Sequence, residues 1–151
     1  MSHLISSPHT SFSITTNGER FYNITSQIKN SLTILMEHSS SDASSGILHL
    51  FTGHTSCALT ISESYDPSAA MDVVNFMKHI APTDLPFITH TQEGIDDSPS
   101  HMKSVLLQQS IALIVDNNQL VLGRWQGIYL AEFRTGSKQR DILLKFQPDP
   151  Q

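Results

Sequence analysis

Alternating and short apolar segments mark strands at both ends of the chain. Residues 11–16, SFSITT, alternate between apolar and polar positions and run into Asn17-Gly18, a pair typical of tight turns. Residues 140–147, RDILLKFQ, form a short apolar segment near the C-terminus. We therefore predict a first and a last strand over these two segments.

The middle and the C-terminal third contain longer apolar segments that also predict strands. Residues 47–63, ILHLFTGHTSCALTISE, predict two strands or one long bent strand, with a glycine at the bend. Residues 110–116 and 119–133 flank Asn117-Asn118. Because asparagine tolerates the positive φ of a two-residue hairpin loop, these two segments predict an antiparallel hairpin.

Three helices are predicted where a polar capping residue precedes apolar residues at helical spacing. Thr25 is the first such cap, Asp66 before Pro67 is the second, and Ser98 before Pro99 is the third. The apolar residues that share one face of the first helix are Ile24, Ile28, Leu32 and Leu35. The sum is an α+β fold of mostly antiparallel β-sheets packed with about three helices.

Size and composition fit a single domain over residues 1–151, with residues 1–10 as a loose N-terminal arm. The net charge of −5 argues against a nucleic-acid or anionic-membrane partner, since such proteins show a basic face. The single cysteine, Cys57, excludes an internal disulfide and a cysteine-built zinc cluster. With no signal-like or membrane-length apolar run, we expect a cytoplasmic protein.

Residues 90–103, HTQEGIDDSPSHMK, concentrate titratable side chains around the third helix start. His90, Glu93 and His101 are residue types that bind divalent metals, because imidazole suits zinc and a carboxylate adds negative charge. Their spacing, H-x2-E-x7-H, is not a recognised zinc signature, and histidines outside metal sites are commoner than ligands. The segment is therefore either a metal site or a solvated connection.

The predicted helix start adds a physical reason for a site. With Ser98 as the N-cap, His101 is the third helical residue, where the positive helix end keeps its ring neutral. Free N–H groups at the same end could hold a phosphate oxygen. Asp96 and Asp97 could hydrogen-bond a ligating histidine or hold Mg²⁺ through water; the alternative is that Asp97 or Ser98 only caps the helix.

Two polar residues stand out in the apolar segment 47–63. His54 follows a glycine in a region that reads as buried strand, which argues against an incidental surface position. Cys57 is expected to be a packed small side chain, because nothing nearby favours a lowered thiol pKa.

The segment LGRWQGIYLAEFR, residues 122–134, combines glycines with charged residues. The two glycines predict a bulge or a close approach of the backbone. Glu132 and Arg134 share one face of the predicted strand and could form a surface ion pair. Alternatively, Arg134 recognises phosphate with its planar guanidinium.

Three stretches together resemble the YjbQ family of small cytoplasmic proteins. They are HTSCALTISESYDP (54–67), HTQEGIDDSPSHMKSVLL (90–107) and LGRWQGIYLAEFR (122–134). Their order and spacing match the family from about Ser11 to Phe146. The resemblance implies packed β-sheets flanked by helices, a homotrimer, and a polar pocket that binds a metal or an anion.

Carried over by motif position, the resemblance also implies the site residues. The implied ligands of a divalent metal, Zn²⁺ or Mg²⁺/Mn²⁺, are His54, His90 and His101. The acidic residues beside them are Glu93, Asp97 and Glu132. The family has been associated with a secondary thiamine-phosphate synthase activity, which joins a pyrimidine pyrophosphate to a thiazole phosphate.

The leading hypothesis is a metal-assisted enzyme acting on a small phosphorylated metabolite, with thiamine-phosphate synthesis as the named candidate. Glu93 and Asp97 would handle a proton or support the ligands. The groups that could hold the anion are Ser98, Lys103, Arg134 and helix amides. Two alternatives stay open: a non-catalytic trimeric module that binds an anionic metabolite or a partner protein, and a structural histidine cluster at a subunit junction.

Overall fold

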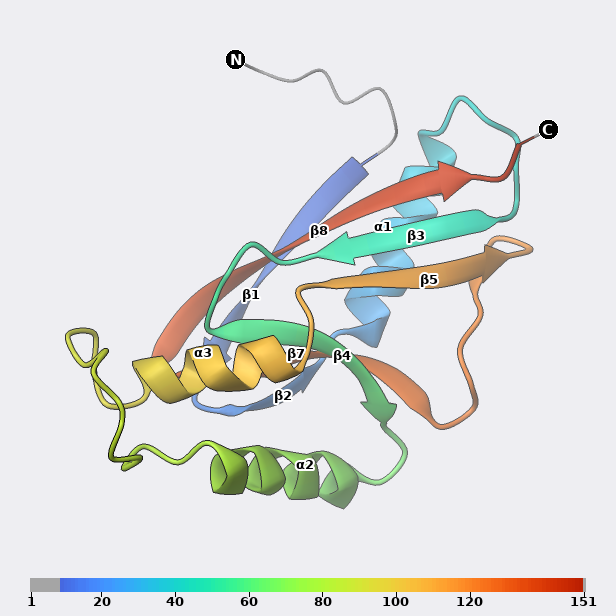
Figure 1. Cartoon of the computed structure of the whole chain (residues 1–151). Coiled ribbons are helices and arrows are strands. Elements are labelled where there is room, and N and C mark those ends of the chain that lie inside the picture. Colours follow the sequence, from blue (N-terminus) through green and yellow to red (C-terminus); the bar gives the residue numbers. More distant parts are fainter. Residues whose placement is uncertain (1–8, 151) are drawn as a thin grey trace, which may run out of the picture.

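The computed structural model describes residues 9–150, which form two antiparallel β-sheets and three α-helices (Figure 1). The elements in chain order are β1 (His9–Asn17), β2 (Arg20–Asn23), α1 (Thr25–Glu37), β3 (Gly46–Phe51), β4 (Cys57–Glu63), α2 (Pro67–Ile80), α3 (Asp97–Leu106), β5 (Ser110–Asp116), β6 (Gln119–Leu120), β7 (Gln126–Glu132) and β8 (Ser137–Pro148). This confirms the predicted α+β fold. The predicted arm, residues 1–10, lies mostly outside the described residues, and its last two residues begin β1.

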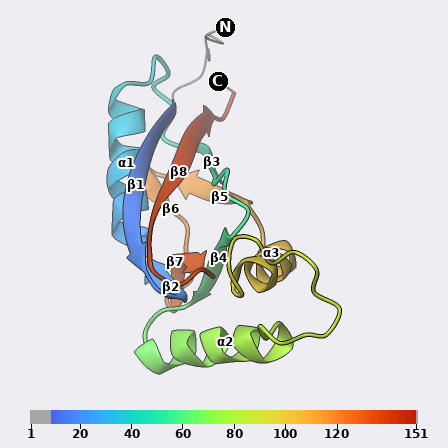
Figure 2. The same cartoon turned by 90° about the vertical axis from the view of Figure 1, so that its left-hand side faces the viewer.

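The larger sheet has the strand order β1-β8-β3-β5-β6, and α1 lies along one of its faces (Figure 2). Every second side chain of β3 and β5 is buried, so each strand turns one face to the core and the other outward. The apolar residues that α1 contributes to this core, with Ile24 just before it, are Ile28, Leu32 and Leu35. The predicted apolar face of the first helix is therefore confirmed.

The smaller sheet, β2-β7-β4, is buried on both faces. In β7, Ile128 and Leu130 pack into the core shared with α1, whereas Tyr129 and Ala131 pack into a second core with α2. Two covered faces explain the unbroken apolar run of this strand, since neither face needs polar side chains.

The sequence places the start of α2 correctly and the starts of α1 and α3 slightly late. Asp66 caps α2 by accepting a hydrogen bond from the backbone N–H of Ser68. Thr25 is already the first residue of α1, and its hydroxyl donates to the Asn23 side chain instead of capping the helix. α3 begins at Asp97, ahead of the predicted serine cap. No described helix has both the length and the hydropathy that a bilayer crossing requires.

The hairpin prediction is confirmed at its turn and corrected after it. Asn117 and Asn118 have φ angles of 51° and 64°, as a two-residue loop of this kind requires. The predicted strand 119–133 is divided, because the chain leaves the larger sheet after β6 and enters the smaller sheet as β7. The four-residue strand β2 was not predicted, since so short a segment shows no clear periodicity.

Candidate metal centre

The helix α3 lies beside the edge of the smaller sheet, where two hydrogen bonds hold it and the segment that follows it. The Ser104 hydroxyl donates to the Cys57 carbonyl oxygen at 3.2 Å, and the Leu59 backbone N–H donates to the Gln108 carbonyl oxygen at 2.7 Å. This placement brings the first turns of α3 against residues 52–56, the loop between β3 and β4. The metal-binding residue types of the sequence therefore gather at one place in the fold.

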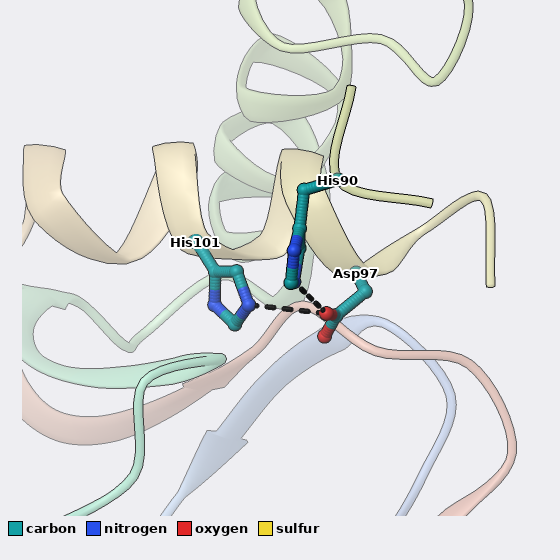
Figure 3. Close-up of side chains that lie close together, drawn as sticks. All are labelled: His90, Asp97 and His101. Atoms are coloured by element: carbon teal, nitrogen blue, oxygen red, sulfur yellow. Dashed lines mark hydrogen bonds and ion pairs between the residues drawn. The ribbon is translucent and has the colours of Figure 1, made fainter. Parts of the chain in front are cut away.

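Three of these side chains converge at the start of α3 (Figure 3). The Nε2 atom of His90 lies 2.8 Å from Oδ2 of Asp97, and Nε2 of His101 lies 3.1 Å from the same oxygen. Asp97 and His101 share one helix face because they are four residues apart. One ligand atom from each residue can be chosen so that all three lie within 4.8 Å of one another. The arrangement is a His-Asp-His set that could hold one metal ion.

The position of His101 in the helix differs from the prediction. Since α3 begins at Asp97, His101 is the fifth helical residue and not the third. The predicted effect of the helix end on the His101 ring therefore does not apply, because that field decays within the first turn.

A backbone contact fixes the protonation of the His101 ring instead. Its Nδ1 lies 2.8 Å from the Thr55 carbonyl oxygen, which can only accept a hydrogen bond, so Nδ1 carries a proton. In the neutral ring Nε2 then has a lone pair, and this lone pair faces the Asp97 carboxylate. Two lone pairs at 3.1 Å repel unless a positive charge, a second proton or a metal ion, accompanies them.

Arg134 holds the carboxylate that the two histidines share. Its Nη1 donates to Oδ1 of Asp97 at 2.7 Å, its Nε donates to Asp96 at 3.0 Å, and its Nη2 donates to the Glu93 carbonyl oxygen at 2.8 Å. Burial would raise the pKa of Asp97, but the hydrogen bond of His90 and the positive charges of a protonated His101 and of Arg134 outweigh it and hold the pKa below its usual range. Asp97 is therefore a fixed, ionised carboxylate.

A cavity of about 650 Å³ opens beside the cluster. Its lining includes His54, His90, Ser98 and His101. The side chains of His90 and His101 are 57% and 35% exposed, so both rings can be reached from this cavity. His54 lies on the cavity wall but outside the three-residue group, and its Nε2 accepts a hydrogen bond from the Asp141 backbone N–H at 3.1 Å.

Residues 5–149 match the model of one protein family, described as UPF0047 protein YjbQ-like. The chain belongs to the YjbQ family. A UPF0047 protein of Synechocystis sp. is 34% identical over 131 residues, which are 87% of this chain and 85% of the relative. The protein YjbQ of Salmonella typhimurium is 40% identical over 102 residues, 68% of this chain and 73% of its own.

Solved structures share the fold of the YjbQ family with this chain. A conserved hypothetical protein of Thermus thermophilus matches with a TM-score of 0.78 and 32% identity over 91% of this chain and 99% of its own. A YjbQ/UPF0047 family protein of Clostridium acetobutylicum matches with a TM-score of 0.78 and 30% identity over the same shares. The resemblance carried by the three sequence stretches is thus confirmed at the level of family and fold.

Two of the other predicted site residues of this YjbQ-family chain are committed to buried ion pairs. Lys103 is only 3% exposed, and its Nζ lies 2.6 Å from the Glu19 carboxylate. Glu132 is fully buried and accepts hydrogen bonds from Arg140 at 2.8 and 2.7 Å. The predicted surface pair of Glu132 with Arg134 is therefore wrong, because the two side chains bind different partners.

Of the remaining residues that the sequence singled out, Glu93 and Ser98 are accessible to solvent, and Cys57 lies in the core. Glu93 is exposed and contacts Arg134 through its backbone carbonyl. Ser98 lines the cavity. Burial raises the pKa of the Cys57 thiol to about 11, in agreement with a packed side chain and against a nucleophile.

Sequence reasoning missed groups that act through the backbone. The Thr55 carbonyl and the Asp141 N–H orient two histidines, yet a backbone group gives no signal in residue type. Arg140 could have been found, since it and Glu132 are opposite charges in apolar strands and demand a partner. Asp97 was named as a possible hydrogen-bond partner of a histidine, and the structure gives it two.

Proposed function

We propose that the protein binds one divalent metal ion, for which Zn²⁺ is the best match, through His90, Asp97 and His101. The observation that carries the proposal is the Nδ1–H of His101 bound to a carbonyl oxygen, which leaves Nε2 facing a carboxylate. Histidine ligands of metals commonly have their second ring nitrogen held in this way. Two imidazoles favour zinc over Mg²⁺, whose preferred ligands are oxygens.

The site has the form of a catalytic centre more than of a structural one. Three protein ligands leave a position for water or substrate, whereas structural zinc sites are closed by four. The exposed His90 and His101 rings border a cavity large enough for a small metabolite. We therefore propose metal-assisted chemistry on a small molecule bound in this cavity.

We propose a phosphorylated molecule as the ligand of this cavity. A divalent cation at the site, when bound, offsets the negative charge of a phosphate or pyrophosphate group. The two cations that the sequence predicts for the anion are already paired: Lys103 binds Glu19, and Arg134 binds Asp96 and Asp97. Near the start of α3 the Ser98 hydroxyl and backbone N–H can orient the anion. The N–H groups of Asp97 and Ser100 cannot, since they already donate to carbonyl oxygens.

Thiamine-phosphate synthesis is the candidate reaction, and family resemblance is its only support. In that condensation the thiazole nitrogen attacks the pyrimidine methylene carbon, and pyrophosphate leaves. Asp97 is held by three partners and serves as a ligand, so it is not free to move a proton. Glu93, an exposed carboxylate at the same loop, is the better candidate for proton handling.

We also propose that the chain assembles with copies of itself, as a trimer in line with the resemblance. The outer face of the larger sheet carries exposed apolar residues: Ile47, Phe51, Ile114 and Leu143. Ile47 pairs with Ile114 across β3 and β5, and Phe51 pairs with Leu143 across β3 and β8. The face therefore carries two apolar pairs, with exposed His49 between them on β3. Phe51 also lines the cavity, which therefore borders the proposed subunit contact.

Titration of chelator-treated protein with Zn²⁺, followed by calorimetry, tests the metal site. The wild type should bind one ion per chain, and His101→Ala and Asp97→Asn should each weaken binding at least tenfold. His79→Ala, an exposed histidine on α2, is the matched control and should bind as the wild type. Equal affinity in wild type and His101→Ala would contradict the assignment.

A second comparison separates an enzyme from a binding module. If product formation from a candidate phosphorylated substrate persists in the double variant His101→Ala/Glu93→Gln, the proposed enzymatic role fails. If His90→Ala instead dissociates the oligomer while the metal stoichiometry of the wild type is zero, the cluster is a structural junction.

A further inference from the structure

We infer that His54 donates a hydrogen bond from Nδ1–H to the anion bound in the cavity and does not bind the metal. The inference rests on the proposed function, because it assigns a further residue to the same site. The loop between β3 and β4 carries both His54 and the Thr55 carbonyl that orients His101.

The loop is fastened to β8 by two side chains. β3 ends at Phe51, which pairs with Leu143, so the backbone groups of Asp141 extend past the last strand pair on that side. The Thr52 hydroxyl donates to the Asp141 carbonyl oxygen at 2.9 Å, and the Asp141 N–H donates to Nε2 of His54 at 3.1 Å. Both backbone groups of Asp141 are thereby satisfied, and the His54 ring is held in one orientation.

This contact determines where the His54 proton resides. A backbone N–H can only donate, so Nε2 of His54 must offer its lone pair. The neutral ring therefore carries its proton on Nδ1. Neither nitrogen is then free to bind a metal, because Nε2 uses its lone pair on Asp141 and Nδ1 has none to give.

The neighbouring loop residue, Thr55, holds a histidine ring in the opposite way, since that ring donates its hydrogen bond and does not accept one. The Thr55 carbonyl accepts from Nδ1 of His101 and leaves Nε2 of that ring as a ligand atom. Of the two adjacent loop residues, Thr55 thus binds the N–H of a ring on α3, whereas His54 is itself a ring held through its lone pair. His101 becomes a ligand and His54 becomes a hydrogen-bond donor.

The Nδ1–H group of His54 is available to a bound molecule. Within residues 9–150 the structure assigns Nδ1 no hydrogen-bond partner, and the half-buried ring lines the cavity with His90, Ser98 and His101. The two nitrogens of an imidazole point away from each other, so Nε2 on the β8 side directs Nδ1 away from that strand. A phosphate oxygen at the metal is an acceptor of the required chemistry.

Three substitutions of His54 distinguish a hydrogen-bond donor from a metal ligand and from a ring that only contacts Asp141. His54→Asn keeps an N–H donor near the position of Nδ1, whereas His54→Gln reaches the position of Nε2 and can only maintain the contact with Asp141. His54→Ala removes both. Each variant is treated with chelator, titrated with Zn²⁺, and the zinc-loaded form is then titrated with inorganic phosphate by calorimetry.

We expect all three variants to bind Zn²⁺ within about threefold of the wild type, while His54→Ala and His54→Gln lose about tenfold in phosphate affinity and His54→Asn loses less. Zinc affinity that falls in His54→Ala as far as in His101→Ala would overturn the inference, since His54 would then be a ligand. The inference would also be overturned if His54→Gln kept the phosphate affinity and His54→Asn lost it. His54 would then act only through its contact with Asp141 on β8. If the wild type binds no zinc, the proposed function fails, and phosphate titration of the same variants without metal still decides the role of His54.

Discussion

Two of the three residues of the cluster, His101 and Asp97, are held by a partner outside it. Thr55 fixes the proton of His101, and Arg134 neutralises one oxygen of Asp97 while leaving the other to the histidines. Groups one step away from a metal commonly orient its ligands and change the affinity measurably. Arg134 is the residue whose contribution can be isolated most cleanly.

Arg134→Ala should weaken Zn²⁺ binding about 10–100-fold, because Asp97 loses its charged partner and the loop 93–97 loses three hydrogen bonds. Arg134→Lys should restore only part of the affinity, since an ammonium cannot bind three acceptors as a planar guanidinium does. Zinc titration measures both. Arg124→Ala is the control, because that arginine is exposed and contacts Trp125 instead; an equal loss there would refute a specific role.

The buried ion pair of Glu132 with Arg140 stabilises the fold and is not part of the site. Glu132 also accepts from the Thr16 hydroxyl at 2.5 Å and from the backbone N–H of Phe133 at 3.0 Å, so both of its carboxylate oxygens are hydrogen-bonded. Glu132→Gln should lower the free energy of unfolding by about 3–5 kcal/mol, because it leaves the Arg140 charge buried without its counterion. Urea unfolding measures this, and Glu93→Gln, an exposed change, should stay within about 0.5 kcal/mol.

The same pair gives the unfolding free energy a pH dependence. Burial would raise the pKa of Glu132, but hydrogen bonds from Arg140 and Thr16 outweigh it and lower the pKa. A lowered folded-state pKa contributes stability above the ordinary glutamate value of about 4.3 and loses it as the pH falls further. Wild type should therefore lose stability below about pH 4. The Glu132→Gln variant should lack this component, and parallel pH profiles of the two proteins would argue against it.

At the residue scale the sequence predicts which types meet but not how they bind. His90 and His101 were predicted together, and Asp97 was among the candidates, because a dense polar segment at a helix start indicates a site. The ion pair of Lys103 with Glu19 could not be predicted, since the two residues are far apart in sequence and only the fold brings them together.

At the scale of elements, helix and strand types were predictable and their ends were less so. Periodicity identified α1 and α2, but α1 begins one residue and α3 two residues earlier than their predicted caps require. The shift matters for α3, because it moves His101 out of the strongest field of the helix end. The predicted close approach at the glycine pair is confirmed, since a Cβ on Gly127 would lie 2.6 Å from Cβ of Ser64.

Gly127→Ala should destabilise the fold by about 1–3 kcal/mol, because β7 and the chain after β4 cannot separate without breaking their hydrogen bonds. Ser64→Gly removes the atoms that the new methyl group meets. The double variant should therefore recover most of the lost unfolding free energy in urea titration. A double variant as unstable as Gly127→Ala would show that the clash with the Ser64 side chain is not the cause.

For the whole molecule, the open face of the larger sheet is the feature that a single chain does not explain. α1 covers one face (Figure 1). The opposite face exposes two apolar pairs, Ile47 with Ile114 and Phe51 with Leu143. Covering these pairs would also shield the cavity wall at Phe51 from water. The sequence alone could not reveal this face, because which side of each strand receives a helix depends on the complete topology.

Ile114→Lys should dissociate the proposed trimer into monomers, because it places a charge on the most exposed of these apolar residues. Light scattering coupled to size exclusion measures the mass directly. Ile34→Lys is the matched control, since Ile34 is a comparably exposed isoleucine on α1, away from the sheet face. Equal masses for wild type and Ile114→Lys, or dissociation by Ile34→Lys instead, would count against this face as the contact.

The most direct test of the metal centre is anomalous diffraction at the zinc absorption edge from crystals grown with Zn²⁺. We predict one strong peak per chain, within bonding distance of Nε2 of His90, Nε2 of His101 and Oδ2 of Asp97, and no bond to His54. A zinc-soaked crystal with no peak among these three atoms, or with His54 bound in place of Asp97, would contradict the account.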